Sequence, residues 1–172
     1  HNTGNHNHAL GHYALHKNVG GAYNFAVSWE ALYYNTTGNH NTGIGYRTLY
    51  LANSGDDNFA AGQCALYNNW GGCYNTAIGY RALLNNTTGD DNTAIGQCAL
   101  YDSLSGKGNF AAGCKALASN SGGHNNTAIG KQALLSNCTG YSNFAVGYQS
   151  LFYTKAGYQN NAIGPYALYE NT

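Results

Sequence analysis

The nine residues NTAIGQCAL, residues 92–100, decide the fold, because variants of this segment recur along the whole chain. Its glycine returns at the same place of every repeat from Gly11 to Gly164, with Ser28 in the one remaining place. The chain therefore contains ten 17-residue repeats without an insertion or deletion, and we number the positions of each repeat 1 to 17, with His1 at position 1. Repeats that keep this register predict stacked coils, because each coil must sit on the next.

Three positions of the repeat never vary: position 4 is glycine, position 7 is asparagine and position 15 is leucine. We interpret position 4 as a turn glycine with positive φ, and position 11, which accepts Ser28, as a place that needs only a small residue. The asparagines predict a ladder of stacked amides and the leucines a continuous core. The fold class is therefore all-β, a parallel β-solenoid of ten coils forming one domain over residues 1–172.

Positions 8 to 11 alternate large and small residues, as expected of a strand, and a second strand is expected from position 13 to 17. Phenylalanine at position 8 accompanies a small residue at position 10, as in Phe59 and Ala61, whereas threonine accompanies isoleucine, as in Thr93 and Ile95. This compensation predicts that positions 8 and 10 share a packed interior, unless duplication simply copied linked pairs. Position 9 is alanine with one glycine, so we expect a second chain to cover that face.

The composition excludes several classes of function. Seven basic and seven acidic residues cancel, so no net charge draws the chain to nucleic acid or to an anionic membrane. The hydrophobic content of 43% argues against disorder, and no apolar stretch is long enough to span a bilayer. The sequence opens directly in the repeat without a signal peptide, so we expect a mature product, a processed fragment or the ordered part of a longer chain.

The NTAIG segments at residues 75–79, 92–96 and 126–130 resemble the head repeats of YadA-like trimeric autotransporter adhesins, which also occur in phage tail fibres. The resemblance covers all ten repeats. It implies a left-handed β-roll, a homotrimer and a role in attachment outside a cell, at a cell surface or on a virion. The long repeat and the five cysteines depart from the family pattern, so the resemblance supports the shape of the module better than its source.

Our leading functional hypothesis is a structural and adhesive fibre module, a head or shaft segment that binds a host-surface protein or a glycan. The alternative is a filament subunit whose coils stack end to end, with no receptor role. Stacked columns of like residues form no cleft in which a nucleophile and a base converge, so we expect no enzyme and no cofactor. We discount an ice-binding solenoid, because the threonines at position 8 alternate with phenylalanines and are expected to be buried.

Several residues are candidates for sites. His6 and His8 have the spacing of one strand face and could hold a metal ion, or they could belong to a polar end coil. Tyrosines at position 16 could stack on sugar rings or on one another, which singles out Tyr33, Tyr50, Tyr67 and Tyr101.

Sequons at position 1 predict glycosylation on one exposed edge, at Asn35, Asn86 and Asn137, although such triplets also arise by chance in turns rich in asparagine and threonine. The five cysteines include no CxxC motif, so free thiols are expected first, interchain disulfides second and metal binding third.

Overall fold

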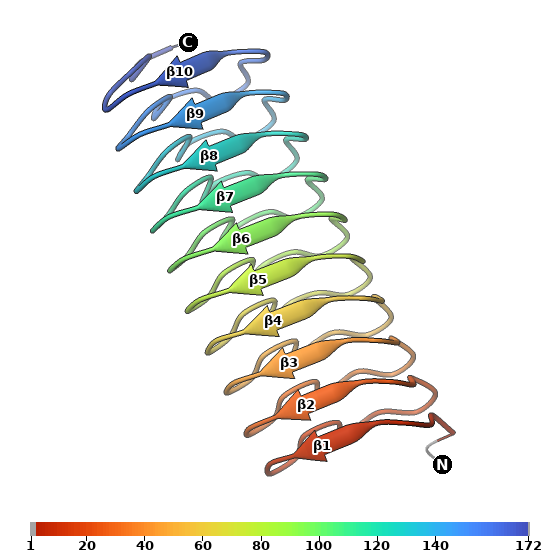
Figure 1. Cartoon of the computed structure of the whole chain (residues 1–172). Helices are drawn as coiled ribbons and strands as arrows, with labels where there is room; N and C mark the ends of the chain where they lie inside the picture. The colour runs from red at the N-terminus through yellow and green to blue at the C-terminus, as the bar shows by residue number, and fades with distance from the viewer. Residues whose placement is uncertain (1–2, 172) are drawn as a thin grey trace.

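The computed structural model describes residues 3–171, which form a slender column of stacked coils (Figure 1). Each coil contributes one three-residue strand, and the ten strands pair in parallel, in chain order, in a single sheet. The strands are β1 His8–Leu10, β2 Phe25–Val27, β3 Thr42–Ile44, β4 Phe59–Ala61, β5 Thr76–Ile78, β6 Thr93–Ile95, β7 Phe110–Ala112, β8 Thr127–Ile129, β9 Phe144–Val146 and β10 Asn161–Ile163. Paired residues occupy the same position of neighbouring repeats, as in Thr93 opposite Phe110, so the predicted parallel β-solenoid is confirmed.

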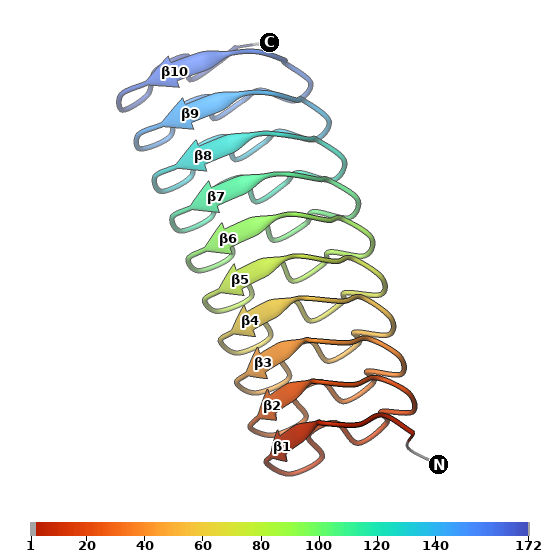
Figure 2. The same ribbon diagram turned by 45° about the vertical axis from the view of Figure 1, so that its right-hand side comes forward.

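The second predicted strand, at positions 13 to 17, is wrong. The residues at position 13 have φ between 52° and 59°, and the leucines at position 15 have φ between 48° and 52°. Their peptide groups still bond between coils in alternating directions: Cys98 N–H donates to Tyr80 of the preceding coil, and Leu100 N–H donates to Ala116 of the next. This side of each coil is therefore a hydrogen-bonded turn (Figure 2), whose left-handed residues are each strained.

The interior of the coil is lined by the alanines of position 9, not by positions 8 and 10. Ala60, Ala77 and Ala94 are fully buried, as are the leucines of position 15 from Leu32 to Leu151. A Cβ on Gly43 would lie 3.4 Å from Leu32 Cδ1, so position 9 faces the leucine column directly. The predictions of a buried position 8 and of a second chain against position 9 are therefore wrong. The small residues are needed because the chain's own leucines fill this narrow interior.

The asparagines of position 7 form the predicted amide ladder, which is confirmed. In the middle of the column, Asn75 Nδ2 donates to Asn58 Oδ1 over 3.1 Å and to the carbonyl oxygen of Gly89 over 2.8 Å. Asn75 Oδ1 in turn accepts the backbone N–H of Asn92 over 3.0 Å. Each amide thus joins three consecutive coils. It also satisfies two buried backbone groups, the carbonyl oxygen at position 4 and the N–H at position 7 of the next coil.

A second, interrupted amide ladder runs along position 1. Asn35, Asn86 and Asn137 each donate to the asparagine one coil below. One coil above each of them the position holds Ala52, Ser103 or Thr154 instead of asparagine, and the Oδ1 atoms of Asn35, Asn86 and Asn137 are buried without a hydrogen-bond partner. We call positions 17 to 6 of the repeat the outer turn. The interruption at position 1 returns at every third coil, so the ladder in this turn has a period of three coils.

The two glycine positions have exchanged the roles that we predicted for them. Position 11 has left-handed backbone, with φ between 119° and 140° for its glycines and 104° for Ser28. The position 4 glycines are not among the residues of 3–171 with positive φ. They are needed because coils approach closely: a Cβ on Gly55 would lie 2.2 Å from the carbonyl oxygen of Gly72.

Replacing Ala52 by asparagine is expected to stabilise the chain. The new amide would donate to Asn35 Oδ1, which has no partner, and to the carbonyl oxygen of Gly55, as Asn86 does to Asn69 Oδ1 and Gly89. We expect a gain of about 1 kcal/mol in the free energy of unfolding, measured by urea denaturation.

Ala52→Asp is the matched control, because aspartate has the same shape but no amide hydrogens. It would place a buried carboxylate beside Asn35 Oδ1 and should lower the stability. Equal effects of the two variants would contradict the interrupted ladder.

Candidate functional site: an exposed apolar sheet face

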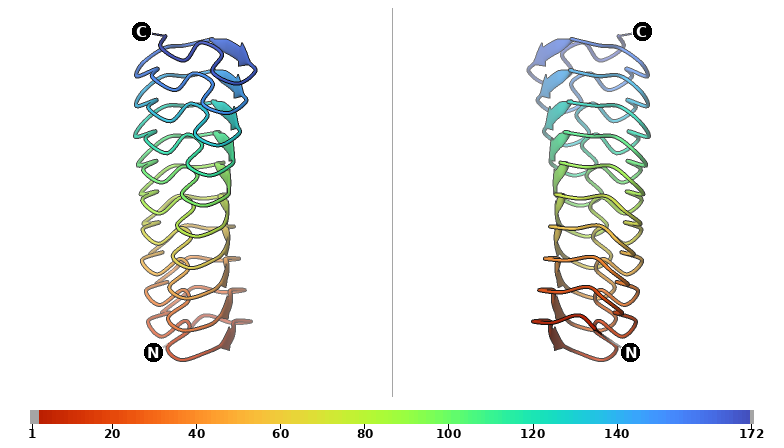
Figure 3. Two further views of the ribbon diagram at one scale, coloured as in Figure 1. Left: turned by 90° about the vertical axis from the view of Figure 1, so that its left-hand side faces the viewer. Right: turned by 90° about the vertical axis from the view of Figure 1, so that its right-hand side faces the viewer.

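The outward side of the sheet is a mostly apolar surface formed by positions 8 and 10, which we call the sheet face. Its large side chains are 38–43% exposed: Phe25, Ile44, Phe59, Ile78, Ile95, Phe110, Ile129 and Phe144. The strands lie along one edge of the column, and no other segment of residues 3–171 lies over their outward side (Figure 3). From β2 to β9 the sheet face is about 34 Å long at about 4.8 Å for each strand.

The sheet face carries no acidic or basic residue between β2 and β9. Monomeric proteins rarely expose apolar patches of more than a few hundred Å², and larger patches usually mark interaction sites. Within each strand a large residue lies beside a smaller one, as Phe59 beside Ala61 and Ile95 beside Thr93. The paired sizes keep the combined volume of positions 8 and 10 similar from coil to coil, so the volume compensation seen in the sequence belongs to an outer face instead of a core.

The exposure of position 8 also corrects the reason for discounting ice binding. Thr42, Thr76, Thr93 and Thr127 lie on the outward face and are half-buried. Phe59 and Phe110 nevertheless interrupt this column, so the sheet face holds no unbroken threonine array.

The tyrosines of position 16 lie on the flank opposite the sheet, and three of the four candidates stack on one another. The ring centroids of Tyr33 and Tyr50 are 5.3 Å apart and those of Tyr50 and Tyr67 are 5.0 Å apart. Burial raises the pKa of the hydroxyls of all three. The stack favours the packing alternative for these residues. Tyr101 is separated from it by Leu84.

An ion pair lies on the same flank, between the second and third coils. Arg47 Nε donates to Glu30 Oε2 over 2.6 Å, between neighbouring coils. This hydrogen bond lowers the pKa of the Glu30 carboxyl and raises the pKa of the Arg47 guanidinium. Arg47 also lies over the ring of Tyr50, 5.3 Å from its centroid, so its charge is already compensated within the chain.

His6 and His8 do not share a strand face. His8 begins β1, whereas His6 lies before the strand with a φ of 58° and stacks on Tyr23 at 4.8 Å. Residues 3–171 contain no cluster of three or more histidine, cysteine or acidic side chains arranged to hold a metal ion.

The position 1 asparagines are not on an exposed edge, which corrects that expectation. Asn35, Asn86 and Asn137 have no exposed surface, and their amides donate within the ladder and to the glycine at position 4 of the same turn. Attachment of a glycan to them in the folded chain would break the ladder.

All five cysteines are free thiols in the structure. No helix capable of spanning a bilayer occurs in residues 3–171.

Sequence reasoning identified the strand but assigned its inner and outer faces the wrong way round. Alternation alone does not say which face is inside. The signal that could have done so is the invariant leucine column, which needs a small residue opposite it, as at Gly43 beside Leu32 of the preceding coil.

No protein-family model, curated protein or solved structure matches this chain. The resemblance to YadA-like heads therefore rests on the repeat residues themselves.

Proposed function

We propose that this chain is a structural module of an extracellular or virion-borne fibre, whose copies associate side by side through the sheet face and which serves attachment. The observation that carries the proposal is the exposed, uncharged and mostly apolar face over eight coils. Burying that face would remove its eight exposed phenylalanine and isoleucine side chains from water. The amide ladders stiffen the rod that such a fibre needs.

The pairing of large and small residues favours copies that point in the same direction. If the copies are related by a rotation axis parallel to the column, coils of the same number lie at the same level. Position 8 of one copy then meets position 10 of the next copy in the same coil. Phe59 then lies over Ala61 and Thr93 over Ile95, so that volumes match. A centred antiparallel pair would instead place Phe59 against Phe110. Three copies, as the resemblance implies, satisfy the parallel arrangement.

Replacing Ile78 and Ile95 by lysine should convert the assembly to monomers, because both side chains lie at the centre of the sheet face and are exposed in the single chain. Two unpaired charges in an apolar contact should raise the dissociation constant by more than about a thousandfold. Multi-angle light scattering measures the mass, and circular dichroism should show an unchanged fold.

Gln97→Lys and Lys155→Gln, exposed substitutions outside the sheet face, are the controls and should leave the mass unaltered. A wild-type chain that stays monomeric at high concentration would contradict the proposal. Polymers that lengthen with concentration, and that persist in the double lysine variant, would favour the end-to-end filament instead.

A further inference from the structure

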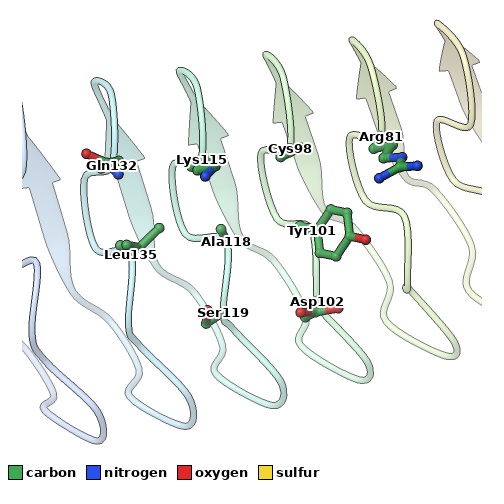
Figure 4. Close-up of a pocket in the computed structure, with 9 residues that line it drawn as sticks. All are labelled: Arg81, Cys98, Tyr101, Asp102, Lys115, Ala118, Ser119, Gln132 and Leu135. Atoms are coloured by element: carbon green, nitrogen blue, oxygen red, sulfur yellow. The ribbon is translucent and has the colours of Figure 1, made fainter.

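A groove follows the column on the flank between positions 13 and 16. It consists of two hollows of about 370 and 380 Å³ that share Arg81 and Tyr101 as lining residues. One hollow reaches Arg47 and the other reaches Gln132, so the groove extends over several coils along the axis. Figure 4 shows the second hollow: Arg81, Cys98, Lys115 and Gln132 form one row, and Tyr101, Ala118 and Leu135 form the row beside it.

The second hollow exists because position 16 is occupied by Ala118 between Tyr101 and Leu135. Tyr101 is also distinct within residues 3–171: the other four tyrosines at position 16 contact an aromatic ring, and its own ring contacts none. Because Tyr101 is half-buried and its neighbour in the column, Ala118, has only a methyl group, part of the tyrosine ring is presented to the hollow.

The positively charged side chains of the groove differ in whether an acidic side chain pairs with them. Arg47 is paired with Glu30, whereas Arg81 and Lys115, both exposed, have no ion pair within residues 3–171. Arg81 lies over the ring of Tyr80, 4.9 Å from its centroid, which holds the guanidinium at the groove. Arg81 and Lys115 are two coils apart, about 9.6 Å along the axis at about 4.8 Å for each coil.

The opposite edge of the hollow offers hydrogen-bonding groups. Asp102 Oδ1 accepts Asn85 Nδ2 over 2.7 Å, which orients the carboxylate, and Ser119 lies one coil above. In the row that contains Arg81 and Lys115, burial raises the pKa of the Cys98 thiol, so this sulfur is uncharged at neutral pH. The groove thus combines an aromatic ring, two unpaired cations and an oriented carboxylate.

We propose that this groove binds a linear acidic polysaccharide. Its carboxylate or sulfate groups would bind Arg81 and Lys115, one sugar ring would pack on Tyr101 over Ala118, and hydroxyl groups would bind Asp102 and Ser119. A linear chain fits because the two hollows adjoin along the axis at Arg81 and Tyr101, and an acidic chain fits because the cations Arg81 and Lys115 lie along it. This inference gives the attachment role a ligand class and to that extent rests on the proposed function.

The test is titration calorimetry at low ionic strength with hexagalacturonate, a sulfated hexasaccharide and a neutral hexasaccharide as probes. We expect at least one acidic probe to bind and the neutral one to bind at least about tenfold more weakly. Replacing Arg81 and Lys115 together by glutamine should weaken binding by about tenfold or more. The matched control Lys155→Gln, an exposed lysine outside the groove, should bind as the wild type does.

Ala118→Leu tests the hollow without removing a charge. Leucine is the residue at the same position in two other coils, Leu84 and Leu135, so the melting temperature should not fall while binding is lost. Retained binding in this variant, equal binding of the neutral probe, or equally tight binding of single-stranded DNA would each overturn the proposal.

The same titration on the double lysine variant of the sheet face separates the two proposals. Binding that survives in monomers supports the groove whatever the assembly does. Loss of binding by the groove variants, with the mass of the assembly unchanged, places the recognition in the groove and not in the sheet face. Absence of binding by an intact assembly would overturn only the groove.

Discussion

Ala94→Lys is expected to prevent the chain from folding. Ala94 has no exposed surface and lies in β6 on the side that faces the leucine column. Lysine at this place would have to displace the leucines and bury an unpaired ammonium group, at a cost of more than about 5 kcal/mol. That loss is comparable with the whole stability of a typical domain. Circular dichroism and urea denaturation measure it.

The neighbouring substitution Ile95→Lys is the matched control, since it adds the same charge at the next residue, on the exposed sheet face. This variant should still fold into the same column, with an unchanged circular dichroism spectrum, even where the charge weakens assembly. If Ala94→Lys folded and only changed the assembly, position 9 would have to face outward, contrary to the packing described above.

Asn75→Ala should produce the second large effect, a loss of about 3–5 kcal/mol in the free energy of unfolding. The substitution removes two bonds donated by Asn75 Nδ2 and leaves the backbone N–H of Asn92 without its acceptor in a buried place. Urea denaturation followed by circular dichroism gives the value.

Asn85→Ala provides the comparison on the outer turn. Asn85 also links neighbouring coils, accepting from Asn68 and donating to Asp102, but its side chain is half-buried and satisfies no backbone group. Its loss should cost less than about 1 kcal/mol. Similar losses for the two variants would mean that the buried ladder adds nothing beyond ordinary surface bonds.

The features that the sequence predicted correctly are those that repeat identically. Ten copies of Asn at position 7 and of Leu at position 15 must each form a column once the coils stack, so the ladder and the core follow from the period. The inner and outer faces of the strand did not follow, because Phe59 and Ala61 read equally well as a core pair or as a surface pair. Their direction depends on how narrow the coil is.

The backbone conformation at positions 13 to 17 could not be predicted from the sequence for a different reason. Leucine strongly disfavours positive φ, yet Leu100 has a φ of 48°. The conformation is stabilised by the buried side chain and by the bond from its N–H to the carbonyl oxygen of Ala116 in the next coil. Local propensity contains no information about a partner that only stacking supplies.

The groove itself was not predicted from the sequence, although two of its lining residues were candidates. Tyr67 and Tyr101 were candidates because of their column, and both line it. In the sequence Ala118 only interrupts the column of tyrosines at position 16, and nothing there indicates a hollow. Aligned columns also place Glu30 one coil below Arg47, so that ion pair could have been found from the repeat.

The interrupted ladder at position 1 has a consequence for how such a protein changes length during evolution. Ala52, Ser103 and Thr154 each end a block of three coils in which position 1 reads asparagine, asparagine and then a residue without an amide. Gain or loss of a whole block therefore keeps this order of residues along the ladder. Gain or loss of a single coil would instead alter the order of amides and gaps. Rod length can therefore vary in steps of about 14 Å, at about 4.8 Å for each coil. Each such step repeats the contacts that the position 1 ladder already makes in this chain.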